Sequence, residues 1–338
     1  MAKRRKRVLR KKDAQKALIA ISILFFLIAV GGYFISRWEN RKYTIEGGES
    51  TVEVETFDAR PKEFTWNGVD YVDNKKVHSY LMMGSDTYDD NESPDTSGSR
   101  ADAQFLLVVD DLNQTWRILL LDRDSFVSVD AYSEDGKKYI ETTNMHLTLA
   151  HIFGDWNFGA RNTVKAVSRM LWNQPIDGFF DMNMSAISIL NDMVGGVPVT
   201  ITTDFTSVDD SLPLGEEVVL MGDQAEHFVR ARMTVDDGTN EARMARQEAY
   251  LKSLINKMAG LSQDEILDIY DSLMSNSITN MGSKTFLDLA DIMNNYTQLD
   301  DIRIQGTHVV EDEGYMFFYL DEDSLTEVIL ELFYVEKN

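Results

Sequence analysis

Charged side chains in this sequence gather at one end of a predicted hairpin. Residues 103–109 and 117–121 have the pattern of strands, and the short polar segment between them suits a hairpin turn. If Val109 pairs with Trp116, the residues before the first strand lie opposite those after the second. A further strand predicted over 78–84 adds one more aspartate if it runs beside them. The charged residues gathered in this way are Asp86, Arg100, Asp102, Asp122, Arg123 and Asp124.

Four further arginines occur in two closely spaced pairs. Arg230 and Arg232 are two residues apart, so their side chains point the same way if this stretch is extended. Arg243 and Arg246 are three apart at the predicted start of a helix, so they share one helix face. Both pairs are candidates for binding an anion.

Arginines and carboxylates in one place suit a phosphate ester together with a divalent cation. The planar guanidinium group matches phosphate oxygens with two hydrogen bonds. Mg²⁺ prefers one or two carboxylates plus substrate phosphates as its ligands. The alternative is a structural network, in which pairs such as Asp102 and Arg123 only neutralise each other. Spacing alone leaves both interpretations open.

Several other kinds of chemistry are excluded by composition. The chain has no cysteine, which rules out disulfides, thiolate catalysis and cysteine-based zinc sites. Its five histidines lack the spacing of a metal site, and neither a G-x-S-x-G motif nor a P-loop is present. The net charge is −23, and residues 1–37 hold ten basic residues and one acid, which leaves −32 for the remainder. So acidic a surface argues against nucleic-acid binding and against a transcription regulator.

The N-terminal region has the pattern of a membrane anchor. Residues 17–35 carry no charge, span about one bilayer core as a helix, and follow a basic cluster. Basic flanks stay in the cytoplasm. We therefore expect a cytoplasmic tail over 1–16, a single transmembrane helix over 17–35, an extracellular stalk over 36–76 with a short strand at 51–55, and an extracellular domain over 77–338. The alternative is a cleaved signal peptide, whose apolar segment would be shorter.

Strands and helices alternate along the rest of the chain, which predicts an α/β fold with a mixed sheet. Apolar residues at helical spacing and a glycine stop set the predicted helix bounds. Later strands are expected over 197–202, 302–305 and 315–320, and helices over 161–172, 185–194, 222–229, 241–258, 262–274, 283–296 and 324–333.

Seven short segments in a fixed order resemble the LytR-CpsA-Psr family, over residues 77 to the end. The segments are 81–86 (LMMGSD), 99–103 (SRADA), 121–127 (LDRDSFV), 174–177 (QPID), 194–197 (VGGV), 228–232 (FVRAR) and 243–247 (RMARQ). No single segment is specific to this family, but the order of all seven segments behind one predicted membrane helix is. The resemblance implies a central mixed β-sheet flanked by helices, with a long apolar pocket for a lipid tail.

The resemblance also implies an activity and its residues. Such enzymes are extracellular phosphotransferases that move a glycopolymer, such as wall teichoic acid or capsular polysaccharide, from a polyprenyl-pyrophosphate carrier to peptidoglycan through a phosphodiester. By match, Asp86 and Asp102 would hold Mg²⁺ or Mn²⁺. The residues that would bind the diphosphate are Arg100, Arg123, Arg230 and Arg232, supported by Arg243 and Arg246. Of these, Arg123, Arg230 and Arg232 are the candidate catalytic arginines.

The proton acceptor is not fixed by the resemblance. Asp124 is our first candidate and Asp86 the second, although a carboxylate beside arginines has a lowered pKa and is a weak base.

The chain departs from the family pattern at three places: Tyr88 stands where arginine is common, Asp122 where proline is usual, and His146-Leu147-Thr148 where Lys-x-Asn is usual. The alternatives are therefore a polyprenyl-pyrophosphate hydrolase and a non-catalytic binder of lipid-linked glycans.

Overall fold

The computed structural model describes residues 60–86, 99–232, 235, 239–310 and 315–337. Within these ranges no helix has both the length and the apolar character needed to cross a membrane. The helix predicted over 17–35, the strand predicted over 51–55 and Tyr88 lie outside the described residues.

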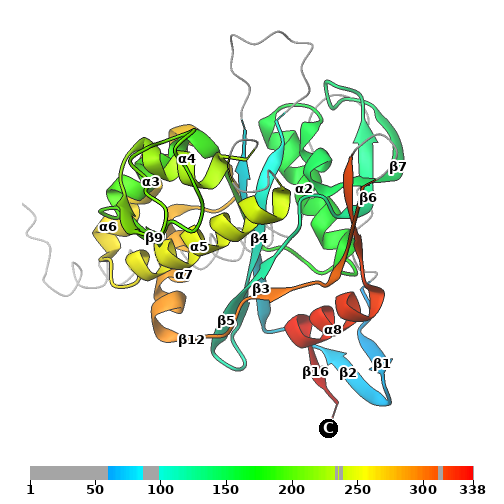
Figure 1. Ribbon diagram of the computed structural model, residues 1–338. Coiled ribbons are helices and arrows are strands. Elements are labelled where there is room, and N and C mark those ends of the chain that lie inside the picture. The colour runs from blue at the N-terminus through cyan, green and yellow to red at the C-terminus, as the bar shows by residue number, and fades with distance from the viewer. Residues whose placement is uncertain (1–59, 87–98, 233–234, 236–238, 311–314, 338) are drawn as a thin grey trace, which may run out of the picture. The chain divides into compact units, whose positions relative to one another are not determined.

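A seven-stranded mixed sheet forms the centre of the domain (Figure 1). Its strands lie in the order β11-β8-β3-β4-β5-β12, and β13 also pairs with β5. β3 runs parallel to β8 but antiparallel to β4, and β4 runs antiparallel to β5, so the predicted mixed sheet is confirmed. The strands are β3 (Val77–Ser85), β4 (Ala101–Asp110), β5 (Thr115–Leu120), β8 (Gly178–Asn183), β11 (Ser277–Thr279), β12 (Thr297–Gln298) and β13 (Ile302–Arg303).

The register of the β4–β5 hairpin is the predicted one, with Val109 opposite Trp116. Both faces of the sheet are covered, so β4 is apolar on both sides. Leu107 packs in one core cluster and Leu106 in the other. This alternation is what fixes the register, because a slip of one residue would exchange the two faces.

Helices cover both faces of the sheet (Figure 1). The first core cluster lies under α3 to α7, and the second lies under α2 and α8. The helices are α2 (Trp156–Met170), α3 (Ile187–Met193), α4 (Asp223–Arg230), α5 (Asn240–Met258), α6 (Gln263–Leu273), α7 (Ser283–Asn295) and α8 (Glu322–Phe333), and the 3-10 turns are η1 (Leu147–Ile152), η2 (Met184–Ala186) and η3 (Met274–Asn276).

Each helix predicted between residues 161 and 333 is present, with shifted ends. α2 begins five residues earlier than expected, because the Asp155 side chain accepts a hydrogen bond from the Phe158 N–H and caps it there. α3 ends before Gly195 and Gly196, whose φ angles of 76° and 81° suit glycine.

The predicted stalk is wrong over residues 60–76. β1 and β2 form a small sheet with the last strand, β16, and Tyr334 of β16 lies opposite Asp73 of β2. The described residues before 77 are therefore part of the folded domain. The bounds are β1 (Glu63–Trp66), β2 (Val69–Asp73) and β16 (Tyr334–Glu336).

Three two-stranded units complete the fold, and two of them flank the site described below. β6 (Phe126–Tyr132) pairs with β7 (Tyr139–His146), a hairpin that sequence patterns did not indicate. β14 (Gly306–Val310) pairs with β15 (Met316–Leu320). The third unit pairs β9 (Val197–Thr200) with β10 (Glu217–Leu220).

Candidate active site

The C-terminal ends of β3 and β5 and the N-terminal end of β4 meet at one edge of the sheet, as the hairpin register predicts. β3 ends at Ser85, opposite the first residue of β4, Ala101. Beyond that pair, the backbone N–H of Asp86 donates to the carbonyl oxygen of Arg100 over 3.2 Å. The chain therefore brings Asp86 and Asp102 to the same edge.

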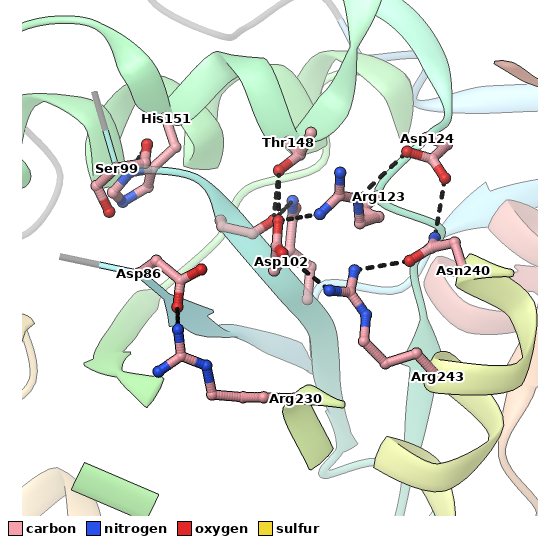
Figure 2. Close-up of polar contacts among 12 residues, drawn as sticks. Asp86, Ser99, Asp102, Arg123, Asp124, Thr148, His151, Arg230, Asn240 and Arg243 are labelled. Carbon is pink, nitrogen blue, oxygen red and sulfur yellow. Dashed lines mark hydrogen bonds and ion pairs between the residues drawn. The ribbon is translucent and has the colours of Figure 1, made fainter. Parts of the chain in front are cut away.

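Asp102 lies at the centre of a buried ion cluster (Figure 2). One carboxylate oxygen accepts a hydrogen bond from Nη1 of Arg123, and the other accepts one from Nη1 of Arg243 over 3.1 Å. The Thr148 hydroxyl donates to the Ala101 carbonyl over 2.9 Å and lies 3.4 Å from Asp102 Oδ1. One carboxylate thus joins two arginines from elements that are far apart in sequence.

Asn240 extends this cluster, and sequence patterns missed it. Its side-chain amide donates to Asp124 Oδ2 over 2.9 Å, and its Oδ1 accepts from Nη2 of Arg243 over 2.7 Å. Asp124 Oδ1 lies 3.2 Å from Nε of Arg123, which closes the ring (Figure 2). The available signal was the spacing, because Asn240 is one helical turn before Arg243 at the start of α5.

Asp86 and Arg230 form the exposed side of the site. Their side chains are 46% and 41% exposed, and Arg230 Nη2 lies 2.9 Å from Asp86 Oδ1 (Figure 2). Burial raises the pKa of Asp86 and the nearby charge of Asp102 raises it further, although Arg230 opposes both effects. Asp86 is therefore easier to protonate than an ordinary aspartate.

The expected extended stretch at Arg230 is wrong. Arg230 is the last residue of α4 rather than part of an extended stretch, so the period-two argument linking it to Arg232 fails. It is also paired with two carboxylates, since Nη1 lies 2.6 Å from Glu226 as well. The helix continues to Arg230 because Glu226 and Arg230 are one turn apart and stabilise each other.

The remaining predicted arginines lie in different surroundings. Arg246 donates to the carbonyl oxygens of Phe228 and Ala231 and stacks over the Phe205 ring at 5.6 Å, so it holds the end of α4. Burial lowers the pKa of Arg243, Asp102 opposes this, and the charges of Arg123 and Arg232 lower it further. Arg100 is exposed at the sheet edge.

A buried pair supports the backbone beneath Arg100. His151 and Asp181 are fully buried, with His151 Nε2 2.7 Å from Asp181 Oδ2. The other ring nitrogen of His151 lies 2.9 Å from the Ser99 carbonyl oxygen, as Figure 2 shows for the two residues. Trp156 donates to the same Asp181 oxygen over 2.6 Å. The sequence identified His151 only as one of five histidines without metal spacing.

Two departures from the family pattern lie in the site. Asp122, at the usual proline position, accepts a hydrogen bond from the Asp124 N–H over 2.8 Å and is 2.9 Å from Nε2 of His308. Burial raises the pKa of Asp122. Within 146–148, Thr148 takes part in the Asp102 cluster, and the His146 ring packs edge-on against Phe317 at 4.4 Å.

The residues present partly fit a divalent cation. In the described part of the chain, no three histidine or acidic side chains are grouped to hold an ion. Asp86 and Asp102 offer the oxygen donors that Mg²⁺ prefers, and substrate phosphate and water can supply the rest. Both Asp102 oxygens already accept from guanidinium groups, so a cation has to share or replace one of these contacts.

Comparison with known proteins places this geometry in a family. The model of the LytR_cpsA_psr family matches residues 42–333. A protein of Bacillus licheniformis named polyisoprenyl-teichoic acid--peptidoglycan teichoic acid transferase TagU is 26% identical over 332 residues, which cover 96% of this chain and 97% of that protein. TagT of Bacillus subtilis, named as the same kind of transferase, is 27% identical over 98% of both chains.

Among solved structures, Bacillus subtilis TagV matches with a TM-score of 0.60 and 25% identity, over 76% of this chain and 96% of that one. The family match spans the central sheet and every arginine and aspartate of the site, from Asp86 to Arg246. The chain is a member of the LytR_cpsA_psr family.

Proposed function

We propose that this protein is a membrane-anchored extracellular phosphotransferase. It moves a glycopolymer from a polyprenyl-pyrophosphate carrier to peptidoglycan and leaves the two joined by a phosphodiester. The relatives named above carry out a transfer of this kind on teichoic acid, according to their names. The observation that carries the proposal is the placement of Arg123, Arg230 and Arg243 around Asp86 and Asp102 at one sheet edge.

In the proposed reaction a sugar hydroxyl of peptidoglycan attacks the phosphorus that carries the glycan. The new oxygen–phosphorus bond forms as the bond to the bridging oxygen breaks, and polyprenyl phosphate leaves. Phosphoryl transfer depends mainly on positioning and on neutralising the oxygens that carry charge. Arg123 and Arg243 are buried and fixed, which suits neutralisation, whereas Arg230 is exposed and can exchange Asp86 for a phosphate oxygen.

The hydroxyl proton needs an acceptor, and two carboxylates compete for this role. Asp124 is held by Arg123 and Asn240, so its lone pairs are engaged. Burial raises the pKa of Asp86, which makes it a stronger base than an ordinary aspartate. In the cation-bound state, however, Asp86 would be a ligand of the cation, so we keep Asp124 as the acceptor during turnover and Asp86 as the alternative.

Asp86 and Asp102 would hold Mg²⁺ or Mn²⁺ together with a substrate phosphate oxygen. When bound, the cation neutralises charge on the diphosphate and on the leaving polyprenyl phosphate. The chain's own contribution is to fix Asp102 between two arginines and to leave Asp86 accessible.

The anchor is the uncharged segment 17–35 behind its basic tail, with the N-terminus in the cytoplasm. Protease added to intact protoplasts should remove the domain. Complete protection of the domain would contradict this orientation and the extracellular substrate.

The activity is tested by incubating the full chain with a glycan-bearing polyprenyl pyrophosphate, with and without peptidoglycan. The proposal predicts polyprenyl phosphate release that depends on the acceptor, together with polymer bound to peptidoglycan. Equal release without the acceptor would indicate a hydrolase. Tight donor binding without any release would indicate a binding protein.

A further inference from the structure

His308 bridges two acidic residues beside the site. It lies on β14, and its Nε2 is 2.9 Å from Asp122 Oδ2 while its Nδ1 is 2.7 Å from Glu241 Oε1. Its ring also packs against Phe318 on the paired strand, with centroids 4.5 Å apart. The His308 side chain is 21% exposed and that of Asp122 is 9% exposed, so the Asp122 side of the bridge is shielded from water, whereas the Glu241 side chain is 49% exposed.

The two carboxylates belong to segments that carry site residues. Asp122 begins the turn that contains Arg123 and Asp124, and it fixes this turn by accepting the Asp124 N–H. Glu241 follows Asn240 in the first turn of α5. His308 therefore joins the turn that carries Asp124 to the helix end that carries its partner Asn240.

A second contact ties the same hairpin to the same turn. The Phe318 N–H donates to the Asp124 carbonyl oxygen over 2.9 Å, and Ser125 bridges to Phe318. The β14–β15 hairpin thus holds the turn through its backbone and through His308. The backbone contact does not depend on pH, whereas the histidine contact does.

The bridge requires a particular protonation state of His308. A neutral imidazole has one N–H and can donate to only one carboxylate, whereas an imidazolium donates to both. The charged groups that face His308 are Asp122 from the turn and Glu241 from α5, and Phe318 from β15 is apolar. Asp124 is bonded to Asp122 through its backbone N–H, and Arg123 is paired with Asp124, so both are linked to His308 only through Asp122.

We propose that His308 is a positioning residue for phosphoryl transfer, whose imidazolium form clamps the catalytic turn to the start of α5. This inference rests on the proposed function and extends it to a residue outside the family's arginine and aspartate pattern. Where the family usually rigidifies this turn with proline, Asp122 and His308 do so through an ionic contact. Activity then declines on the alkaline side, as His308 loses its proton and releases one carboxylate.

The test compares full-length His308→Gln and Glu241→Gln with the parent in acceptor-dependent polyprenyl phosphate release across pH. Misplacing catalytic groups by a fraction of an ångström to one ångström lowers turnover by about 10- to 100-fold. We expect a loss of that order in kcat for His308→Gln, with an unchanged KM for the lipid donor. The alkaline decline of the parent should be absent in this variant.

His78→Gln is the matched control. His78 also lies between two carboxylates, 3.5 Å from Asp111 and 3.4 Å from Asp177, but it stands at the opposite end of β3 from Asp86. This control should keep the parental rate and pH profile. An unchanged alkaline decline in His308→Gln, or parental turnover in that variant, would overturn the proposal.

A second readout does not need activity. In protein labelled with ¹⁵N-histidine, the His308 signals, assigned by their loss in His308→Gln, should keep both ring protons to a higher pH in the parent than in Glu241→Gln. Loss of the second ring proton at the same pH in both proteins would overturn the clamp. If the parent released no polyprenyl phosphate, the proposed function would fail, and this spectrum would still decide whether the clamp exists.

Discussion

Two aspartates in this protein are each held by two basic side chains, yet only one of the two belongs to the site. Asp102 is held by Arg123 and Arg243, and Asp130 on β6 is held by Lys165 and Arg169 on α2. The Asp130 cluster is closed, since Thr142 donates to it over 2.6 Å and its side chain is 3% exposed.

The Asp102 cluster is open on one side, and this is the difference that matters. Asp102 is 14% exposed, and it lies beside the accessible pair of Asp86 and Arg230. The buried Nε of Arg243 also has no hydrogen-bond partner. A buried ion pair is therefore not by itself a sign of a site, because the same motif stabilises β6 against α2. The sign is a cluster whose cations have capacity left for a ligand.

Removing the central carboxylate should have the largest effect. Asp102→Ala leaves Arg123 and Arg243 buried without their shared counter-charge, which costs about 3 to 5 kcal/mol of unfolding free energy. Two charge-assisted hydrogen bonds are also lost, so turnover should fall by about 100- to 10,000-fold. Denaturant unfolding and polyprenyl phosphate release measure the two effects. Parental values of both would show that Asp102 is not the centre of the site.

Removing the divalent cation should have the next largest effect on turnover. Chelation with EDTA should stop turnover, and added Mg²⁺ or Mn²⁺ should restore it. Asp86→Asn should raise the cation concentration needed for half-maximal rate, with little change in stability, because its ion pair is exposed and worth about 1 kcal/mol or less. Full turnover in metal-free buffer would refute the assignment of Asp86 and Asp102 as ligands.

Arg230 and Arg232 should have a smaller effect on rate and almost none on stability. Arg230→Ala removes a charge-assisted hydrogen bond to phosphate worth roughly 1.5 to 3 kcal/mol, or about 10- to 150-fold in rate. Arg232→Ala should fall in the same range. Lysine at either position should restore only part of the rate, because it lacks the planar fork. Normal turnover in both alanine variants would contradict a phosphate-binding role.

Asp130→Asn should leave turnover unchanged and lower stability. Burial acts to raise the pKa of Asp130, but hydrogen bonds from Lys165 and Thr142 outweigh it, so the pKa is lowered. The stabilisation is complete above the unfolded pKa of about 3.9 and is lost as the pH falls through the lower folded pKa. Thermal unfolding of the parent should therefore show an acid-side slope that is reduced in the variant. An equal slope in both would mean that Asp130 is not stabilised by its charge.

The sequence predicted contacts between neighbours well and contacts between distant segments poorly. Asp102 and Arg123 are found together because the β4–β5 turn and the two-sided apolar pattern fix the register. Asn240 was missed because its partner Asp124 lies 116 residues away on another element. The bridging position of His308 was missed for the same reason.

Local sequence patterns also failed to predict secondary structure where a short segment has a partner far away in the sequence. Residues 63–73 look like a polar linker, and they become strands only because β16, at the far end of the chain, pairs with them. Arg230 was placed in an extended stretch because Ala231 and Arg232 carry no helix-ending signal that fixes the boundary. The structure ends α4 one residue later than predicted, at Arg230, and as a helical residue Arg230 pairs with Glu226 and Asp86.

The most direct test compares Asp102→Asn with Asp130→Asn in one transfer assay. Both variants remove one carboxylate charge from between two cationic side chains and keep the shape of the side chain. The assay contains glycan-bearing polyprenyl pyrophosphate, peptidoglycan and Mg²⁺. We predict that Asp102→Asn forms both products, polyprenyl phosphate and polymer-linked peptidoglycan, about 100-fold or more slowly than the parent. Asp130→Asn should stay within about twofold of the parent at a temperature where both variants are folded. Equal loss in the two variants, or parental transfer by Asp102→Asn, would contradict the assignment of the open cluster as the active site.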